Sequence, residues 1–143
     1  MRLFIAAALL ATATAAPAAA ETAGSDLTFT LENVRSSSGQ VVVALFDSEA
    51  AYKAKDRPVR TAKLPVSGGK VDVAWSGLKP GSYAAVAFHD RDSDGKLDTL
   101  PIGLPIEPFA ISRDAPARFG PPSWRAAVFS VAPGLNHQWA KLR

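Results

Sequence analysis

The sequence predicts an antiparallel β-sandwich of about seven strands with a proline-rich flap. Three observations support this fold class. Short apolar runs alternate with polar residues at a period of two, turn signals rich in Gly, Pro and Ser separate the runs, and no helical pattern exceeds two turns. Runs of short strands joined by turns are typical of two sheets packed face to face.

The first strand is predicted where apolar residues alternate with polar ones, at Leu27, Phe29 and Leu31. A turn at residues 35–39 (RSSSG) leads into residues 40–46 (QVVVALF). These residues are apolar on both faces, as expected of a central strand. Ser48 is placed to cap one short helical turn before Pro58 ends it.

Two further strands are predicted at residues 60–66 and 70–75. The Ser-Gly-Gly turn at residues 67–69 lies between them, so we expect the two to form a β-hairpin. Residues 83–89 then form another strand. Its two faces are Ala84, Val86 and Phe88 on one side, and Tyr83, Ala85, Ala87 and His89 on the other.

The flap, residues 99–124, is rich in proline and cannot hold a regular ladder or helix for long. Its apolar residues argue for packing over disorder: Ile102, Leu104, Ile106, Phe109, Ile111 and Phe119. The small alanine face of strand 83–89 is the predicted place for it to pack. Strands at residues 126–131 and 136–142 complete the sandwich.

The first twenty residues have the pattern of a secretory signal peptide. One basic residue, Arg2, precedes a short apolar run and the small triplet Ala18-Ala19-Ala20, so we expect cleavage before Glu21. Residues 21–143 then form a single domain. The expected location is the periplasm or the outside of the cell, and a component of the cell envelope is one role consistent with export.

Composition narrows the classes of partner. The chain has no Cys, so an exported fold must rely on packing, rigid loops or a bound ion for stability. Without Arg2, 15 Lys and Arg stand against 13 Asp and Glu, a net charge of +2, and the basic residues form no block. We therefore expect no nucleic-acid binding. No later apolar run approaches the length needed to span a bilayer, so we also expect no transmembrane segment in the mature chain. The sequence identifies no partner.

The stretch FHDRDSDGKLD, residues 88–98, has the ligand spacing of a calcium loop. Calcium prefers oxygen ligands, and a D-x-D-x-D-G loop supplies them at alternate positions and from a main-chain carbonyl. The expected ligands are Asp90, Asp92, Asp94, the carbonyl of Lys96, and Asp98. The twelfth position of such a loop needs a bidentate carboxylate, but Pro101 stands there.

Two interpretations of this loop are open. Four carboxylates so close together repel one another unless a cation or water screens them, which favours a structural Ca²⁺ site. Alternatively, the aspartates bond to their own backbone in Asx-turns of a solvated loop, and Gly95 supplies a positive φ.

No motif in the sequence supports an enzyme. The two histidines lie outside any H-E-x-x-H pattern, and neither a G-x-S-x-G elbow nor a glycine-rich phosphate loop is present. We expect a non-catalytic module. The alternative is a small-ligand binder or hydrolase with a site between the alanine face and the flap, formed by His89, Glu107 and Trp124.

The runs YAAVAFHDRDSDGKLD, IGLPIEPFAIS and FGPPSWRAAVFSV resemble the exported bacterial family called domain of unknown function 2141. The likeness covers about Leu27 to Leu142. It implies export and a β-sandwich of the transthyretin-like or carboxypeptidase-regulatory-like type. The strand pattern by itself also fits an immunoglobulin-like sandwich. That family more often carries asparagine within the acidic run, so the charges of Asp92 and Asp94 favour a cation. No activity follows from the resemblance.

Overall fold

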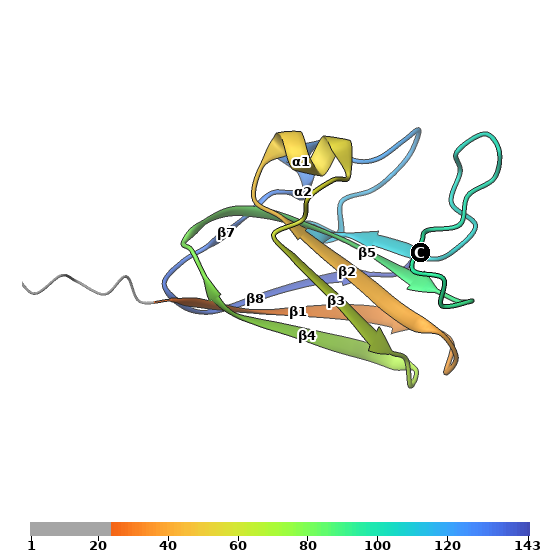
Figure 1. Cartoon of the computed structure of the whole chain (residues 1–143), viewed down its shortest axis with the longest axis horizontal. Helices are drawn as coiled ribbons and strands as arrows, with labels where there is room; N and C mark the ends of the chain where they lie inside the picture. The colour runs from red at the N-terminus through yellow and green to blue at the C-terminus, as the bar shows by residue number, and fades with distance from the viewer. Residues whose placement is uncertain (1–23) are drawn as a thin grey trace, which may run out of the picture.

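The alternating segments pair into two sheets in the computed structural model, which describes residues 24–143 (Figure 1). The strands are β1 (Ser25–Val34), β2 (Gln40–Phe46), β3 (Arg60–Pro65), β4 (Gly69–Leu78), β5 (Gly81–Asp90), β6 (Phe109–Ile111), β7 (Phe129–Val131) and β8 (Gly134–Lys141). Short helices are α1 (Glu49–Ala54), the 3₁₀ turn η1 (Ser112–Asp114) and α2 (Trp124–Ala127). The signal peptide expected at residues 1–20 lies outside this range. From residue 24 onward, no helix is long and apolar enough to cross a membrane.

The sheets stack as a sandwich, as the sequence predicts. One sheet has the order β4-β1-β8, and the other has the order β3-β2-β5-β6, with β7 also paired to β5. Inward side chains of both sheets form the main core, and several of them are fully buried: Phe29, Leu31, Val41, Val43, Leu45, Ala85 and Ala87. The central position predicted for residues 40–46 is confirmed, because β2 lies between β3 and β5.

The predicted hairpin of residues 60–66 and 70–75 is wrong. β3 pairs with β2, placing Ala62 opposite Val43, whereas β4 pairs with β1 in the other sheet, placing Val73 opposite Phe29. The turn between them crosses from one sheet to the other, with Gly69 at φ 77°. Both strands direct their apolar faces into the same core, so the alternation gives no information about which neighbour each strand pairs with.

The pairing of β1 with β8 is parallel, which departs from the purely antiparallel sandwich that the sequence predicts. Phe29 lies opposite Gln138 in this pair. The first and last strands of the domain are therefore neighbours, and β1 is the centre of its sheet. A parallel pair of this kind needs a long connection, which the rest of the sandwich supplies.

The alanine-rich strand β5 packs on both faces. Ala85 and Ala87 face the opposite sheet, while Ala84 belongs to a second core beneath the short helices. That second core contains Phe46, Tyr52, Ile111, Ala115 and Ala127. The expected cap of α1 is confirmed, since Ser48 Oγ accepts a hydrogen bond from Ala51 N at 3.3 Å.

The flap does not cover the face of β5 that carries Ala85 and Ala87, because that face packs on the opposite sheet, and its predicted position there is wrong. Part of the flap packs instead with Ala84 on the other face of β5. Residues 109–111 pair with β5 as the edge strand β6, whereas Ile102 and Phe119 are 78% and 104% exposed. A tight turn around residues 99–105 projects from the body of the domain (Figure 1). Residues 126–131 are also only partly a strand, because Ala126 and Ala127 end the helix α2.

The two sheets meet at the end of the sandwich that carries the acidic loop. Leu142, just after β8, is 1% exposed, and its N–H donates to Glu32 O. Phe109 of β6 and Arg143 exchange two backbone hydrogen bonds, of 3.1 and 3.0 Å. This seam brings the flap, the end of β5 and the residues after β8 together.

Candidate cation site

The acidic loop begins at the last residue of β5, and that residue is fully buried. Asp90 lies opposite Gln40 of β2 and has no exposed surface. Its Oδ2 accepts hydrogen bonds from Gln40 Nε2 at 2.7 Å and from Gly95 N at 2.8 Å, and its Oδ1 accepts one from Asp94 N at 3.1 Å. A single strand-end carboxylate therefore fixes the path of the loop.

Asx-type turns shape the exposed part of the loop. Asp92 Oδ1 accepts from Asp94 N at 3.2 Å, and Asp94 Oδ1 accepts from Lys96 N at 2.7 Å. Gly95 adopts a φ of 83°, in the left-handed region that favours glycine. The turn chemistry expected of a solvated aspartate loop is thus present, together with a buried carboxylate at its base.

Glu107, from the segment that precedes β6, closes the loop from the other side. Its Oε1 accepts from Arg91 N at 2.7 Å and its Oε2 from Asp98 N at 3.1 Å, while the side chain is only 5% exposed. The first and last parts of the loop are therefore held by one carboxylate that is distant in sequence.

Glu107 was assigned to a small-ligand site by sequence, and its place beside the aspartates was missed. The available signal was weak: it is the only glutamate in the flap, and the twelfth position of the loop lacks a carboxylate. Only the return of the flap to β5 brings it there.

The acidic side chains form two overlapping groups. Asp90, Asp92 and Glu107 each offer a carboxylate oxygen within 4.8 Å of the other two, and Asp92, Asp94 and Asp98 do the same. Calcium binds oxygen at 2.3–2.6 Å, so oxygens on opposite sides of one ion lie up to about 5 Å apart. The spacing of these oxygens is therefore compatible with a shared divalent cation.

Electrostatics differ sharply between the two ends of the loop. Burial acts to raise the pKa of Asp90, but hydrogen bonds from Gln40 and Gly95 outweigh it, so this pKa lies below its ordinary value. Burial raises the pKa of Asp98, and the negative charges of Asp92 and Glu107 raise it further. The hydrogen bonds thus stabilise the charge of Asp90, whereas repulsion is concentrated at Asp98.

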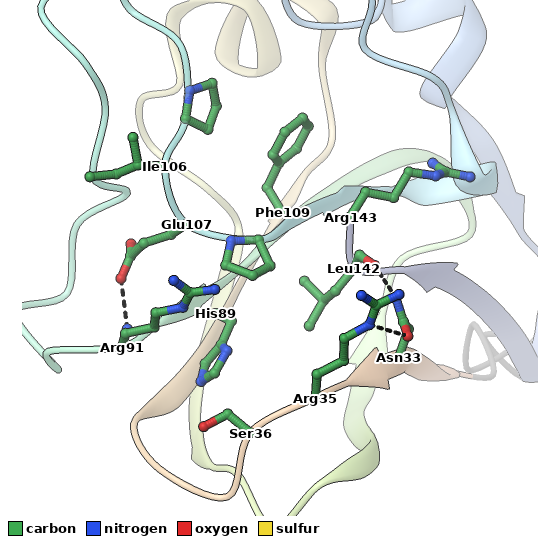
Figure 2. Close-up of a pocket in the computed structure, with 12 residues that line it drawn as sticks. Asn33, Arg35, Ser36, His89, Arg91, Ile106, Glu107, Phe109, Leu142 and Arg143 are labelled. Carbon is green, nitrogen blue, oxygen red and sulfur yellow. Dashed lines mark hydrogen bonds between the residues drawn. The ribbon is translucent and has the colours of Figure 1, made fainter.

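The three residues of the predicted ligand site do not converge. His89 is 2% exposed and its Nε2 donates to Ser38 O at 2.8 Å; with Glu107 it lines a cavity next to the acidic loop (Figure 2). Trp124 is half-buried and packs against the second core, with its ring 5.8 Å from that of Tyr52. It is not among the residues that line the cavity.

His137, the other histidine, lies on the outer face of β8. Its Nε2 is 2.9 Å from Thr30 Oγ1, and that hydroxyl donates to Asp72 Oδ1 at 2.5 Å. His89 belongs to the other sheet, so the two histidines do not combine with Glu107 as ligands of one metal.

Comparisons with known proteins identify a family but no activity. The family model described as "Uncharacterized protein conserved in bacteria (DUF2141)" matches residues 29–138. No curated protein and no solved structure gives a significant match. The match spans both sheets, the acidic loop and the flap.

Proposed function

Because the chain belongs to the DUF2141 family, whose description names no activity, we propose from its geometry that it is a non-catalytic β-sandwich module with a structural Ca²⁺ site. We further propose that the module is exported to the periplasm or the cell exterior, on the evidence of residues 1–20. Binding of the ion would fix the base of the flap to the end of β5, in a chain that has no disulfide to do so.

The observation that carries the proposal is the position of Glu107. The loop motif lacks its twelfth carboxylate, and a glutamate from the flap lies within 4.8 Å of Asp90 and Asp92 oxygens instead. Its burial, at 5% exposed, is unusual for a glutamate unless it is paired. A cation on this group would be held by residues from both sides of the loop.

The carboxylates of Asp90 and Glu107 have lone pairs that are not used in hydrogen bonds and could bind an ion. An ionised carboxylate has about four acceptor positions. Three of those on Asp90 and two on Glu107 receive N–H donors. The remaining lone pairs, together with Asp92 and Asp98, are available to a hard cation, whose charge would remove the repulsion that raises the pKa of Asp98.

The test is thermal unfolding with calcium or with chelator. An ion that binds only the native state adds RT ln(1 + [L]/Kd), about 2.7 kcal/mol when calcium is 100-fold above Kd. For a domain of this size that raises the melting temperature by roughly 5–15 °C. Titration calorimetry should give a matching saturable heat.

The substitution Asp92→Asn separates the ion site from a plain Asx-turn. Asparagine keeps the side-chain oxygen that accepts from Asp94 N, so the turn survives, but the charge is lost. We expect this protein to melt normally in chelator and to lose most of the calcium response. Equal melts of the unsubstituted protein in calcium and chelator, without binding heat, would leave the solvated-turn interpretation as the correct one.

A further inference from the structure

A cavity of about 750 Å³ opens beside the acidic loop, at the seam between the two sheets (Figure 2). Its walls come from the turn after β1, the end of β5, residues 105–109 of the flap and residues 142–143. The volume lies in the range of sites for small molecules. None of the four aspartates lines the cavity, and Glu107 is the one residue that it shares with the proposed ion site.

Basic and apolar residues share the lining. The basic ones are Arg35, Arg91 and Arg143, and the apolar ones are Pro105, Ile106, Pro108, Phe109 and Leu142. Glu107 is the only residue with a carboxylate side chain among the lining residues, and each of its oxygens accepts a hydrogen bond from a backbone N–H. The cavity therefore combines positive charge with an apolar wall.

Within the part of the chain that the structure describes, two of the three guanidinium groups form no ion pair. Arg143 pairs with Asp114 outside the cavity. Arg35 and Arg91 take part in none of the ion pairs formed within residues 24–143. In Figure 2 their side chains flank the cavity on two sides, with Leu142 between them.

A strained residue positions Arg35. Asn33 adopts a φ of 64° at an irregularity in the pairing of β1 with β4. Its Nδ2 donates to Leu142 O at 2.7 Å, and its Oδ1 accepts from Arg35 Nε at 3.1 Å. This chain of hydrogen bonds holds the Arg35 head group at the rim, and strain of this kind is often found at ligand sites.

From these observations we propose that the cavity binds a small organic carboxylate. The carboxylate pairs with Arg35 and Arg91, whose planar guanidinium groups suit bidentate contacts, and the apolar body lies against Pro108, Phe109 and Leu142. A ligand with only one of these two features would not match the cavity. An inorganic anion would leave the apolar wall exposed to water, and a neutral apolar ligand would leave Arg35 and Arg91 without a negative partner.

The carboxylate could belong to a free acid or to the C-terminus of a peptide, and two probe pairs distinguish these sources. The first pair is 4-phenylbutyrate and its neutral amide. The second is the dipeptide acid N-acetyl-Leu-Phe and its C-terminal amide. Binding is followed by chemical-shift changes of the Ile106 and Leu142 methyl groups at 150 mM salt. Each measurement is made in calcium and again in chelator, so that failure of the ion site is separable from failure of the cavity.

We expect both acids, or one of them, to bind at least tenfold more tightly than the matching amide. A stronger response to the dipeptide acid identifies a peptide terminus as the source, and a stronger response to 4-phenylbutyrate identifies a free acid. Arg35→Gln and Arg91→Gln should each weaken binding about tenfold or more. Arg125→Gln, an exposed arginine of α2 outside the cavity, is the matched control and should leave binding unchanged.

Three results would overturn the proposal. They are equal affinity for acid and amide, an equal loss of binding in the Arg125→Gln protein, and methyl shifts that do not change up to 10 mM of either acid. Competition by inorganic phosphate as strong as by 4-phenylbutyrate would also contradict it, since the apolar wall would then contribute nothing.

Discussion

At the scale of single residues, burial separates two kinds of carboxylate in the acidic loop. Asp90 and Glu107 are buried and hold backbone N–H groups, whereas Asp92 and Asp94 are exposed. Asp98 lies between the two kinds, half-buried and surrounded by negative charge. The buried pair organises the loop, and the remaining repulsion is what a cation would relieve.

We expect Asp98→Asn to stabilise the calcium-free protein at pH 7. The folded-state pKa of Asp98 is raised above its unfolded value of about 3.9, so the native state binds more protons than the unfolded state between these two values. Stability therefore falls as the pH rises through this window. The destabilisation by the charged Asp98 is absent at pH values below this window and complete above it. The Asp98→Asn substitution removes this destabilisation.

Thermal melts in chelator from pH 3 to pH 7 check this expectation. The gain in melting temperature should be present at pH 7 and vanish near pH 3. Asp26→Asn, at an exposed position in β1, is the control and should show no such dependence. A gain of the same size at both ends of the pH range would show that charge repulsion is not its cause.

At the scale of elements, the flap divides into a packed strand and a projecting turn. β6 adds to β5 and covers the second core, while the turn is closed by its own backbone bonds, such as Leu100 N to Leu104 O at 2.8 Å. The turn is ordered without burying its aliphatic side chains. Its role in stability should therefore be small compared with that of the strand.

Two isoleucines of the flap test this division. Ile111→Ser removes a side chain that is 4% exposed and should cost at least 2–5 kcal/mol of unfolding free energy, on the scale of large-to-small core changes. Ile102→Ser, at 78% exposed, should stay within about 0.5 kcal/mol. Urea unfolding of both proteins gives the comparison. A large loss from Ile102→Ser would mean that the turn packs on the domain in solution.

At the scale of the whole molecule, the sandwich is closed at one end by residues that follow its last strand. Leu142 is buried in the main core, and Arg143 bonds to the backbone of β6 in the opposite sheet. The same seam forms one wall of the cavity and lies beside the proposed ion site. Stability of the seam and ligand binding should therefore be linked.

A pair of leucines tests the contribution of the seam. Leu142→Ala should cost about 2–5 kcal/mol, because a side chain that is 1% exposed leaves a void. Leu135→Ala, at 92% exposed on β8, should change stability by less than about 0.5 kcal/mol. Guanidinium unfolding monitored by tryptophan fluorescence measures both. Similar effects of the two substitutions would argue that the seam contributes little.

Local features were predictable because the backbone imposes them at short range. Alternation in β1 and β4 identified strands and their buried faces, since successive side chains of a strand point to opposite sides. The Ser48 cap and the aspartate turns likewise depend on contacts within a few residues. Sequence alone therefore determined the fold class, the short helix α1 and the place of the acidic loop.

Tertiary structure decided every relation between distant segments. It placed β3 beside β2 and not beside β4, and it set Glu107 against Asp90. In the folded chain Trp124 packs against the second core and not beside His89, and three arginines lie at one cavity. The physical reason is that pairing and convergence depend on how all faces are buried at once, and the same alternating pattern fits several partners equally well.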